Sequence, residues 1–238
     1  MLSFRGRHRE RDGLRLLGIS GVDDLIARLG RIDSCGISDA LDKLGLPGTV
    51  GGIHRFTTDR RIAGRVLTVT MGAAEGRPST TRHLCTAAIE AANPGDVIVV
   101  EQRTGLDAAC WGGNLALGAQ VRGVAGVIVE GPARDIDDCR KLDFPVFARE
   151  HTARTARGRI VEVATNEPVR VGEVTVAPGD YVVADGSAVV FVPQAEILRV
   201  LETAESIVAR EEAMAENLRK GMPISQVMGI NYETMLKK

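Results

Sequence analysis

Residues 111–137 have the sequence WGGNLALGAQVRGVAGVIVEGPARDID, which is the densest pattern of glycines, apolar runs and charged turn residues in the chain. The segment 111–122 predicts a helix that begins at two glycines, and the apolar run 124–130 predicts a buried strand. The turn residues Gly131 and Pro132 follow that strand. Asp135 and Asp137 then predict the first turn of another helix. This alternation of helix, buried strand and helix is typical of an α/β domain, in which ligands bind where the parallel strands end.

The segments on either side of this stretch continue the alternation of strands and helices. Residues 81–92 predict an alanine-rich helix. Two Pro-Gly-Asp turns, at 94–96 and 178–180, each lead into a short apolar strand, because Pro presets φ and Gly accepts a positive φ. Apolar side chains at helical spacing from Ile197 to Leu218 predict a long C-terminal helix. No linker divides the chain, so we expect one domain with a helical C-terminal arm.

Composition limits the classes of protein to which the chain can belong. Of its 238 residues, 44% are hydrophobic and 26% are charged, with a net charge of -1, which is typical of a globular protein. Without a surplus of Lys and Arg, binding of nucleic acid through a basic face is not expected. No stretch approaches the ~20 apolar residues of a membrane span, and residues 1–20 lack the apolar core of a signal peptide. We therefore expect a cytoplasmic protein that acts away from membranes.

The four cysteines, Cys35, Cys85, Cys110 and Cys139, form no C-x-x-C pair. This spacing indicates neither a zinc ribbon nor a dithiol redox site. Buried free thiols are the expected state, because free cysteine is among the most buried residue types.

Arg134 and Asp135, directly after the predicted buried strand, are the strongest candidates for a functional site. An arginine offers a planar fork for a carboxylate, and an aspartate offers a hard oxygen ligand for a divalent cation. One carboxylate is chemically sufficient for Mg²⁺, which takes its other ligands from water and substrate. The alternative is structural, with Asp135 as an acid at a helix N-terminus and Arg134 as a surface ion-pair partner.

The run Gly112-Gly113-Asn114-Leu115 is the second candidate. Glycines at the start of a helix leave backbone N–H groups open to an anion, and the helix dipole favours negative charge there. The alternative is a tight packing turn beside Trp111. If the two loops face each other across the edge of the sheet, one binds a carboxylate and the other holds a metal.

Several common catalytic arrangements are missing from the sequence. The chain has no G-x-S-x-G, Walker, H-E-x-x-H or strand-linked G-x-G-x-x-G motif, and its four histidines are far apart. A Schiff base needs a desolvated lysine. Of the five lysines, Lys43 falls on a polar helix face and three lie in a charged C-terminal segment, which leaves Lys141. For carbonyl chemistry, a metal Lewis acid is therefore favoured.

The segment 112–137 resembles the signature of the RraA-like family, and the resemblance extends from about Ser34 to about Gly221. That family contains metal-dependent 4-hydroxy-4-methyl-2-oxoglutarate aldolases and protein regulators of ribonuclease E activity, and its members are often mislabelled as demethylmenaquinone methyltransferases. The resemblance implies a single-domain α/β/β sandwich similar to the swivelling phosphohistidine domain. It also implies assembly as trimers or hexamers, with sites at the subunit interfaces.

The resemblance implies a role for each candidate residue. Arg134 matches the arginine that binds the pyruvyl end of the substrate, and Asp135 matches the ligand of Mg²⁺ or Mn²⁺. The backbone amides of residues 112–115 match the loop that receives the pyruvate carboxylate. In the aldolases, an acidic residue from a neighbouring subunit's C-terminal helix reaches the water shell of the metal, and Glu211 or Glu212 matches it loosely.

Two positions distinguish this chain within the family pattern. The aldolases carry an acidic residue where this chain has Gly113, so a carboxylate that orients water is expected to be absent. The ribonuclease regulators tend to lose the metal-binding aspartate, which this chain keeps as Asp135.

Residues 1–18 lie outside the resemblance, and we expect them to be an N-terminal extension of a domain formed by residues 19–238.

These expectations favour a divalent-metal-dependent lyase that acts on a small 2-oxo acid through a pyruvate enolate. It would be an aldolase of the 4-hydroxy-4-methyl-2-oxoglutarate type, an oxaloacetate decarboxylase, or both. The alternative is a non-catalytic regulatory protein that binds a ribonuclease or another protein. A methyltransferase is not favoured, because no glycine-rich signature for a methyl donor follows a strand.

Overall fold

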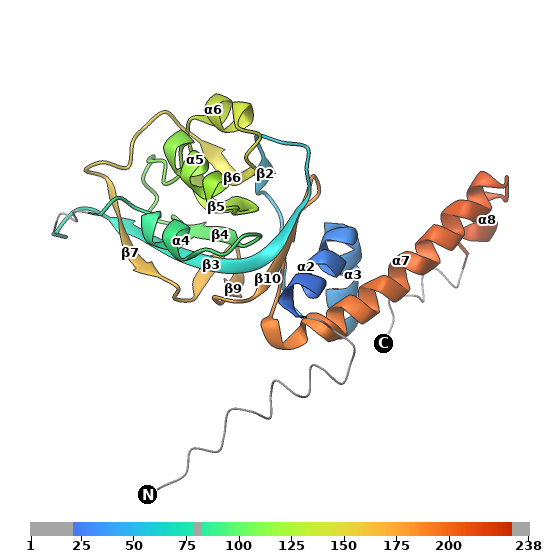
Figure 1. Cartoon of the computed structure of the whole chain (residues 1–238). Coiled ribbons are helices and arrows are strands. Elements are labelled where there is room, and N and C mark those ends of the chain that lie inside the picture. Colours follow the sequence, from blue (N-terminus) through green and yellow to red (C-terminus); the bar gives the residue numbers. More distant parts are fainter. Residues whose placement is uncertain (1–20, 79–81, 230–238) are drawn as a thin grey trace, which may run out of the picture.

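A curved mixed sheet forms the body of the protein, and four parallel strands form its centre. In the computed structural model, which describes residues 21–78 and 82–229, these strands are β3 (Ile62–Ala73), β4 (Val97–Glu101), β5 (Gly126–Ala133) and β6 (Val146–His151). Their apolar, β-branched character follows from burial on both faces, as in other parallel sheets. The sheet and the long C-terminal helix confirm the predicted α/β class (Figure 1).

Antiparallel strands extend the sheet beyond these four. The order across the sheet is β1-β11-β10-β3-β4-β5-β6-β2, and β7 pairs with the carboxyl half of β3. These strands are β1 (Thr49–Val50), β2 (His54–Arg55), β7 (Ile160–Thr165), β10 (Tyr181–Ala184) and β11 (Val189–Val192). A separate hairpin consists of β8 (Val169–Val171) and β9 (Val174–Val176). The two Pro-Gly-Asp turns thus lead into β4 and β10, as predicted.

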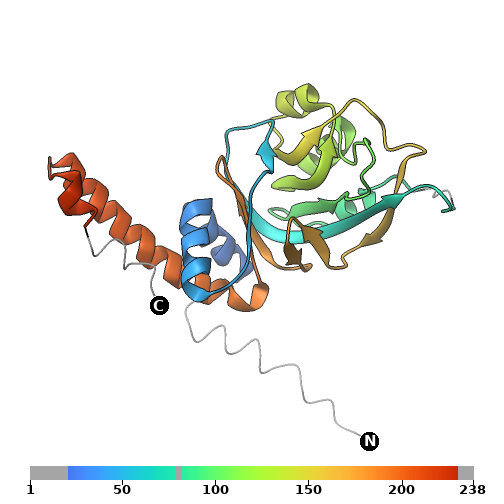
Figure 2. The same ribbon diagram turned by 180° about the vertical axis from the view of Figure 1, so that it is seen from behind.

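The helices fall into two groups at different parts of the sheet. Helices α4 (Thr86–Ala91), α5 (Gly113–Val121) and α6 (Ile136–Lys141) lie over the parallel strands, whereas α2 (Val22–Arg31), α3 (Ser34–Leu44) and α7 (Ile197–Arg219) pack at the antiparallel end (Figure 1). The segments η1 (Gln194–Glu196) and α8 (Ile224–Val227) flank α7. Seen from behind, α7 leaves the body as an extended arm (Figure 2). Within the described ranges, no helix is long and apolar enough to cross a membrane.

Alternating side chains on the parallel strands divide the core into layers. Ile98 and Val100 of β4 pack with residues of α4 and α5, whereas Val97 and Val99 belong to the opposite layer. In that layer they share a cluster with β10 and β11, including Phe191, so the sheet curls around its own apolar face. A third cluster joins α2, α3 and α7 to β10 and β11. The loops at the carboxyl ends of the parallel strands therefore pack on the cluster formed with α4 and α5. Helix α7 belongs to a different cluster.

One predicted helix is shorter than the sequence suggests. The helix predicted over residues 81–92 begins only at Thr86, because Cys85 adopts the left-handed conformation with φ of 64° and interrupts the helical path. The predicted extension, residues 1–18, lies outside the described residues.

Three of the four cysteines are buried free thiols, as expected, but Cys35 is exposed. It occupies the outer side of α3, so the general preference of cysteine for burial does not hold there. Burial raises the pKa of Cys110 to about 12 and that of Cys139 to about 11. These two thiols are protonated at neutral pH and are unreactive structural groups.

Asp185, in the turn between β10 and β11, fixes the start of α3. Its carboxylate accepts hydrogen bonds from the backbone N–H of Ser34 at 2.8 Å, from the hydroxyl of Ser34 at 2.7 Å, and from the N–H of Ser187 at 2.9 Å. Burial alone would raise the pKa of Asp185, but these hydrogen bonds and the nearby Arg61 guanidinium lower it below its ordinary value. The turn is thus tied to α3 through an ionised carboxylate.

Replacing Asp185 with Ala is expected to lower the free energy of unfolding by about 1–3 kcal/mol at neutral pH, because the Ser34 donors lose their acceptor. The folded-state pKa is lower than the unfolded one, so the stabilisation is complete above the unfolded value of about 4 and is lost as the pH falls through the folded value. Urea unfolding at neutral pH and at about pH 3 measures both effects.

Asp59→Ala is the control, because Asp59 is a fully exposed partner of Arg55. It is expected to change stability by less than about 0.5 kcal/mol. Equal losses in the two variants, or a loss in Asp185→Ala that does not shrink in acid, would contradict the role of Asp185.

Candidate functional site

The candidate site lies where β5 ends. The segment that precedes α5 runs alongside β5 there, because Trp111 forms a parallel bridge with Ala133 and the N–H of Arg134 donates to the carbonyl oxygen of Trp111 at 2.9 Å. This backbone pairing sets Gly112 beside Asp135. The structure thus brings together the two loops that the sequence singles out, although a helix and a strand separate them along the chain.

Asp135 has a backbone conformation that turns its side chain toward the glycine loop. It directly precedes α6 in the left-handed region, with φ of 54° and ψ of 39°, and its side chain makes no capping hydrogen bond to that helix. Instead, Oδ2 accepts a hydrogen bond from the N–H of Gly113 at 3.1 Å, and Oδ1 accepts one from Nε of Arg134 at 3.1 Å. The carboxylate therefore points across the site and not at its own helix.

Position 112 requires glycine because a Cβ atom does not fit there, and not because the backbone adopts a conformation that only glycine favours. A Cβ atom there would lie 2.7 Å from Oδ2 of Asp135 and 3.1 Å from Cγ of Arg134, closer than ordinary contact. The φ of Gly112 is −158°, which any residue adopts. At Gly113, a Cβ would lie 3.4 Å from Cβ of Asp138 and 3.5 Å from Cβ of Asp135, which is ordinary contact. Position 113 therefore has space for a Cβ atom, although the chain has glycine there.

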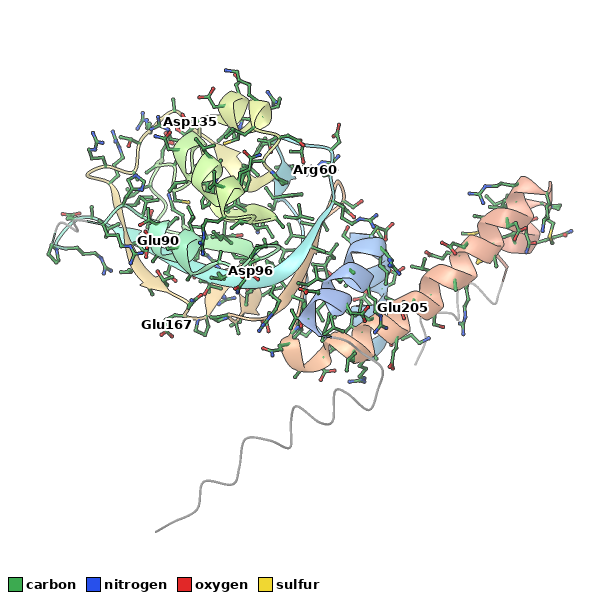
Figure 3. The ribbon with its side chains drawn as sticks, viewed as in Figure 1. Arg60, Glu90, Asp96, Asp135, Glu167 and Glu205 are labelled. Carbon is green, nitrogen blue, oxygen red and sulfur yellow. The ribbon has the colours of Figure 1, made fainter. Side chains whose placement is uncertain are left out.

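Two cavities meet at Asp135. One has a volume of about 210 Å³, and its lining includes Gly112, Leu115, Arg134 and the loop of residues 155–157. The other has a volume of about 460 Å³ and is lined by residues of α5 and α6. Figure 3 shows Asp135 at the end of the body that carries these two helices. The first cavity is smaller than the roughly 300–1,000 Å³ of pockets for drug-sized ligands, so it suits a small molecule.

The donors at this site suit a hard divalent cation that takes few ligands from the protein. The side chains of Arg134 and Asp135 are 35% and 34% exposed, so a small ligand can reach the carboxylate. Among the described residues, no group of three His, Cys, Asp or Glu side chains is arranged to hold a metal ion. A single oxygen donor does not suit a structural zinc site, but it fits Mg²⁺ or Mn²⁺, which retain water and substrate oxygens.

Lys141, the lysine that the sequence leaves open for a Schiff base, has the wrong environment for one. Its side chain is 77% exposed, and Nζ donates a hydrogen bond to Asp138 at 3.0 Å. This hydrogen bond and the charge of Asp138 raise the pKa of Lys141, whereas a Schiff-base lysine needs a lowered pKa. The ammonium group is therefore protonated at neutral pH.

Two residues of the smaller cavity, Arg157 and His83, could not be assigned to it from the sequence. The loop of Arg157 reaches the site because Ala109 forms a parallel bridge with Thr155 and donates its N–H to the carbonyl oxygen of Arg154 at 3.0 Å. This pairing joins segments far apart in the chain, and the sequence pattern around Arg157 does not show which cavity the loop lines. The pairing adds a basic side chain to the lining of the cavity.

Glu211 and Glu212 do not belong to this site within one chain. They lie on α7 and line a separate cavity of about 350 Å³ together with Asp33 and Arg61. Burial raises the pKa of Glu211, and the carboxylates of Asp39 and Asp33 raise it further. Helix α7 packs with α3 at the end of the body that lies away from α5 and α6 (Figure 1, Figure 2).

The fold and the site together define a class of α/β protein. In this class, an Arg-Asp pair at the end of a parallel strand faces a helix that begins with glycines, an arrangement suited to a small anion and a hard cation. A family model described as RraA-like, Aldolase/RraA, matches residues 34–191. The chain belongs to the RraA-like family.

Relatives of known sequence carry different names. A protein of Halalkalibacterium halodurans, named provisionally as a 4-hydroxy-4-methyl-2-oxoglutarate aldolase, is 31% identical over 82% of this chain and 90% of its own length. Protein DlpA of Legionella pneumophila is 26% identical over 86% of this chain, but the chain spans only 33% of its length. The chain also spans only 59% of an uncharacterized protein of Methanocaldococcus jannaschii.

A solved structure supports the fold and adds another name. The crystal structure of Streptomyces coelicolor RraAS2, an unusual member of the RNase ES inhibitor RraA protein family, matches with a TM-score of 0.75 and 26% identity. The match covers 82% of this chain and 98% of that chain. Similar proteins are therefore named both for an aldolase activity and for inhibition of a ribonuclease.

Replacing Gly112 with Ala is expected to displace the Asp135 carboxylate, because the added methyl group would overlap Oδ2. Overpacking of this kind costs about 1–3 kcal/mol. Gly113→Ala is the matched control, since its methyl group meets its neighbours at ordinary contact distance. Thermal unfolding and crystal structures of both variants test the expectation. If both variants unfold alike and keep Asp135 in place, the close contact at Gly112 is not a constraint.

Proposed function

We propose that the protein is a divalent-metal-dependent lyase that releases pyruvate from a small 2-oxo acid. The proposal rests on the geometry of Asp135, whose carboxylate is held beside a small cavity by the N–H of Gly113 and by Arg134. The provisional aldolase name of the Halalkalibacterium relative supports this reaction class. Aldol cleavage and oxaloacetate decarboxylation pass through the same pyruvate enolate, so the site suits either reaction.

The start of α5 offers donors for the substrate carboxylate. The helical hydrogen bonds begin with the N–H of Ala116, which donates to the carbonyl oxygen of Gly112 at 3.0 Å, and the N–H of Gly113 is used by the aspartate. The amides of Asn114 and Leu115 therefore precede these bonds, where the helix dipole favours an anion. We assign the carboxylate of the 2-oxo acid to this position.

Arg134 is placed to stabilise the charge that develops during cleavage. When the bond between C3 and C4 of the substrate breaks, its electron pair stays on the pyruvyl half, which becomes an enolate. Asp135 would hold a divalent cation, which when bound would supply Lewis acidity toward the 2-oxo group. Because Nε of Arg134 is bound to Asp135, the terminal nitrogens of the guanidinium remain to donate to the enolate oxygen.

Protons complete the two possible reactions. In aldol cleavage, the C4 hydroxyl loses its proton to water in the half-exposed site and becomes the carbonyl of the released product. In decarboxylation, C4 leaves as carbon dioxide. In both, a proton added to C3 of the enolate yields pyruvate. With glycine at position 113, we assign this proton to water that enters through the half-exposed site.

A non-catalytic regulator of a ribonuclease is the second candidate, because the RraAS2 structure belongs to a family named for such inhibition. The two functions differ in what they require. An enzyme requires turnover to depend on Asp135, whereas a regulator requires a stable protein complex without turnover. We favour the enzyme, since the carboxylate of Asp135 faces a cavity of ligand size and not a flat surface.

Replacing Asp135 with Asn is expected to lower metal-stimulated pyruvate release by about 100-fold or more, because the amide keeps the shape of the side chain and removes its charge. Pyruvate formed from 4-hydroxy-2-oxoglutarate and from oxaloacetate is measured with Mg²⁺ and with Mn²⁺. Asp137→Asn is the control and is expected to keep its activity, since Asp137 is an exposed partner of Arg140 on α6.

Two outcomes would contradict the proposal. Full activity of Asp135→Asn in excess EDTA would show that the metal assignment is wrong. Failure of the unaltered protein to release pyruvate from any 2-oxo acid, together with a stable ribonuclease complex in a pull-down, would favour the regulator.

We further propose that the protein assembles as a trimer or hexamer in which α7 of one subunit reaches the site of another. The arm formed by α7 and α8 extends away from the body (Figure 2). Large apolar side chains are exposed on this arm and on α5, namely Leu218, Met222, Ile224, Met228, Leu117 and Val121. Burial between subunits would cover them. Glu211 or Glu212 would then approach Asp135 of the neighbouring subunit.

Glu211→Gln or Glu212→Gln is expected to lower pyruvate release, whichever of the two carboxylates reaches the neighbouring site. Mixing and refolding the impaired variant with inactive Asp135→Asn subunits should restore part of the activity, because some mixed sites combine two intact side chains. Light scattering measures the assembly state of each sample. A monomer with full activity, or a mixture that recovers no activity, would contradict shared sites.

A further inference from the structure

The cavity of about 210 Å³ beside Asp135 has few groups in its lining that can accept a proton. Among the described residues of that lining, the ionisable side chains are His83, Cys110, Arg134, Asp135 and Arg157. Arginine stays protonated, and burial raises the pKa of Cys110 to about 12, so neither type of side chain supplies a base at neutral pH. Asp135 is already bound to the N–H of Gly113 and to Arg134. His83 is the group that remains.

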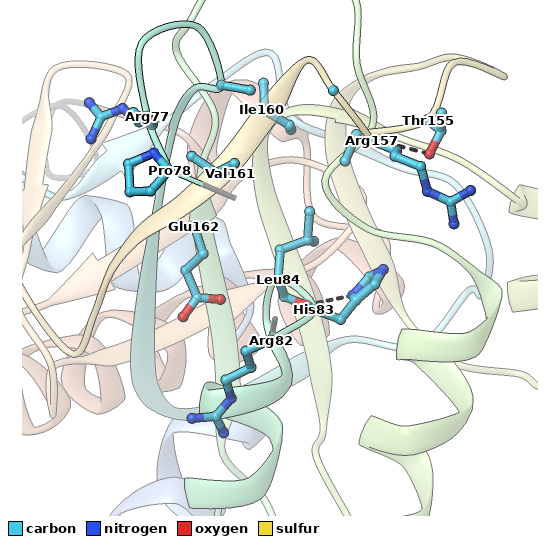
Figure 4. Close-up of a pocket in the computed structure, with 13 residues that line it drawn as sticks. Arg77, Pro78, Arg82, His83, Leu84, Thr155, Arg157, Ile160, Val161 and Glu162 are labelled. Carbon is cyan, nitrogen blue, oxygen red and sulfur yellow. Dashed lines mark hydrogen bonds between the residues drawn. The ribbon is translucent and has the colours of Figure 1, made fainter. Parts of the chain in front are cut away.

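A neighbouring cavity of about 430 Å³ offers no better acceptor. Its lining includes His83, Arg157 and Glu162, and the first two also line the smaller cavity. Oε2 of Glu162 accepts a hydrogen bond from the N–H of Cys85 at 2.5 Å, and Oε1 accepts one from the hydroxyl of Thr165. In Figure 4, Glu162 lies on one side of Leu84, and the ring of His83 lies on the other side, toward Arg157. The carboxylate of Glu162 is thus engaged outside the smaller cavity.

A contact with the backbone fixes the tautomer of His83. Nδ1 lies 3.0 Å from the carbonyl oxygen of Leu84, and a carbonyl oxygen can only accept a hydrogen bond. Nδ1 therefore carries the proton of the neutral imidazole, and the lone pair is on Nε2. Among the described residues, the ring makes no other hydrogen bond, so no protein group occupies Nε2. A neutral imidazole in this state is suited to accept a proton.

We propose that Nε2 of His83 is the base in aldol cleavage and accepts the proton of the C4 hydroxyl through one water. This inference rests on the proposed function, in which Arg134, Asp135 and the start of α5 hold the pyruvyl half of the substrate and water in the site takes up that proton. His83 lines the same small cavity as these groups, so one water can connect the C4 hydroxyl to Nε2.

The proton transfers of this step balance. The hydroxyl proton passes to the water, and a proton of that water passes to Nε2. As this happens, the bond between C3 and C4 breaks, its electron pair stays on the pyruvyl half, and C4 becomes a carbonyl. The water that protonates C3 becomes hydroxide, and the imidazolium of His83 returns a proton to it. Decarboxylation involves no such hydroxyl, because C4 leaves as carbon dioxide, so it does not need this base.

The test compares the two reactions in one variant. His83→Gln keeps a polar side chain that cannot take up a proton at neutral pH. With Mg²⁺, kcat for aldol cleavage of 4-hydroxy-2-oxoglutarate is expected to fall by about 100-fold, which is typical for loss of a general base. The kcat for decarboxylation of oxaloacetate is expected to stay the same, whereas a merely structural role of His83 would lower both.

His54→Gln is the matched control, because His54 is an exposed histidine of β2 that lines neither cavity. It is expected to leave both reactions unchanged. The side chain of His83 is also exposed, and its ring is bound only to the carbonyl of Leu84 among the described residues. Variants at position 83 are therefore expected to fold, and circular dichroism checks this.

A second variant tests the missing base directly. In His83→Ala, imidazole added to the solution is expected to restore part of the aldol activity, because the exposed position of His83 lets a small molecule enter. Imidazole is expected not to raise the activity of the unaltered protein. A change in structure alone would not be repaired in this way.

The possible outcomes separate this inference from the proposed function. The role of His83 is overturned if His83→Gln lowers both reactions equally or neither of them, or if imidazole restores no activity to His83→Ala. If the unaltered protein decarboxylates oxaloacetate but does not cleave 4-hydroxy-2-oxoglutarate, the lyase proposal stands and the role of His83 fails. If it releases pyruvate from neither substrate, the lyase proposal fails and the role of His83 fails with it.

Discussion

The site depends on the backbone pairing between Trp111 and the end of β5. The N–H of Arg134 donates to the carbonyl oxygen of Trp111, and this bond sets the distance between the glycine loop and Asp135. Trp111 is 1% exposed and stacks on Phe144, with ring centroids 6.1 Å apart. A buried aromatic side chain thus anchors the loop one residue before Gly112. In the proposed function, the N–H donors at the start of α5 would be held in place before a ligand binds, which lowers the entropy cost of ordering them.

This pairing also accounts for the unusual backbone of Asp135. With Gly112 so close, the carboxylate fits only because the glycine has no Cβ, and the left-handed conformation brings Oδ2 to the N–H of Gly113. A non-glycine residue in this region is held by its surroundings, and such strain is typical of functional sites. The site therefore combines the Asp135 carboxylate with the Arg134 guanidinium and backbone amides, and Arg157 and His83 add to the lining of the same cavity. Positively charged side chains and backbone N–H groups that are already in position suit a reaction in which negative charge develops on an oxygen atom.

The sequence predicts the parts of the site that follow from local pattern. Asp135 follows a buried strand and Gly112 precedes a helix, so both belong to one α/β unit. Arg157 reaches the same cavity only through pairing between distant segments, which no local pattern encodes. The late start of α4 has the same kind of cause, because the N–H of Cys85 donates to Glu162 of β7. Local propensity favours a longer helix there, and a tertiary contact overrides it.

The apolar cluster beneath α5 and α6 is separate from the one that holds α7, so the site and the arm lie at opposite ends of the folded body. The buried side chains of α7 end at Ile207, although the helix continues to Arg219. The turns as far as Ala215 still line a cavity with residues of α2 and the start of α3, whereas the last turn projects from the body (Figure 1). A helical segment without tertiary packing is marginal in water. The exposed Leu218 of this last turn therefore argues for a packing partner that the described residues of the same chain do not provide. In the proposed assembly, Leu117 and Val121, which are exposed on α5, would meet the arm of a second copy, and the contact that stabilises the arm would also bring it to the site.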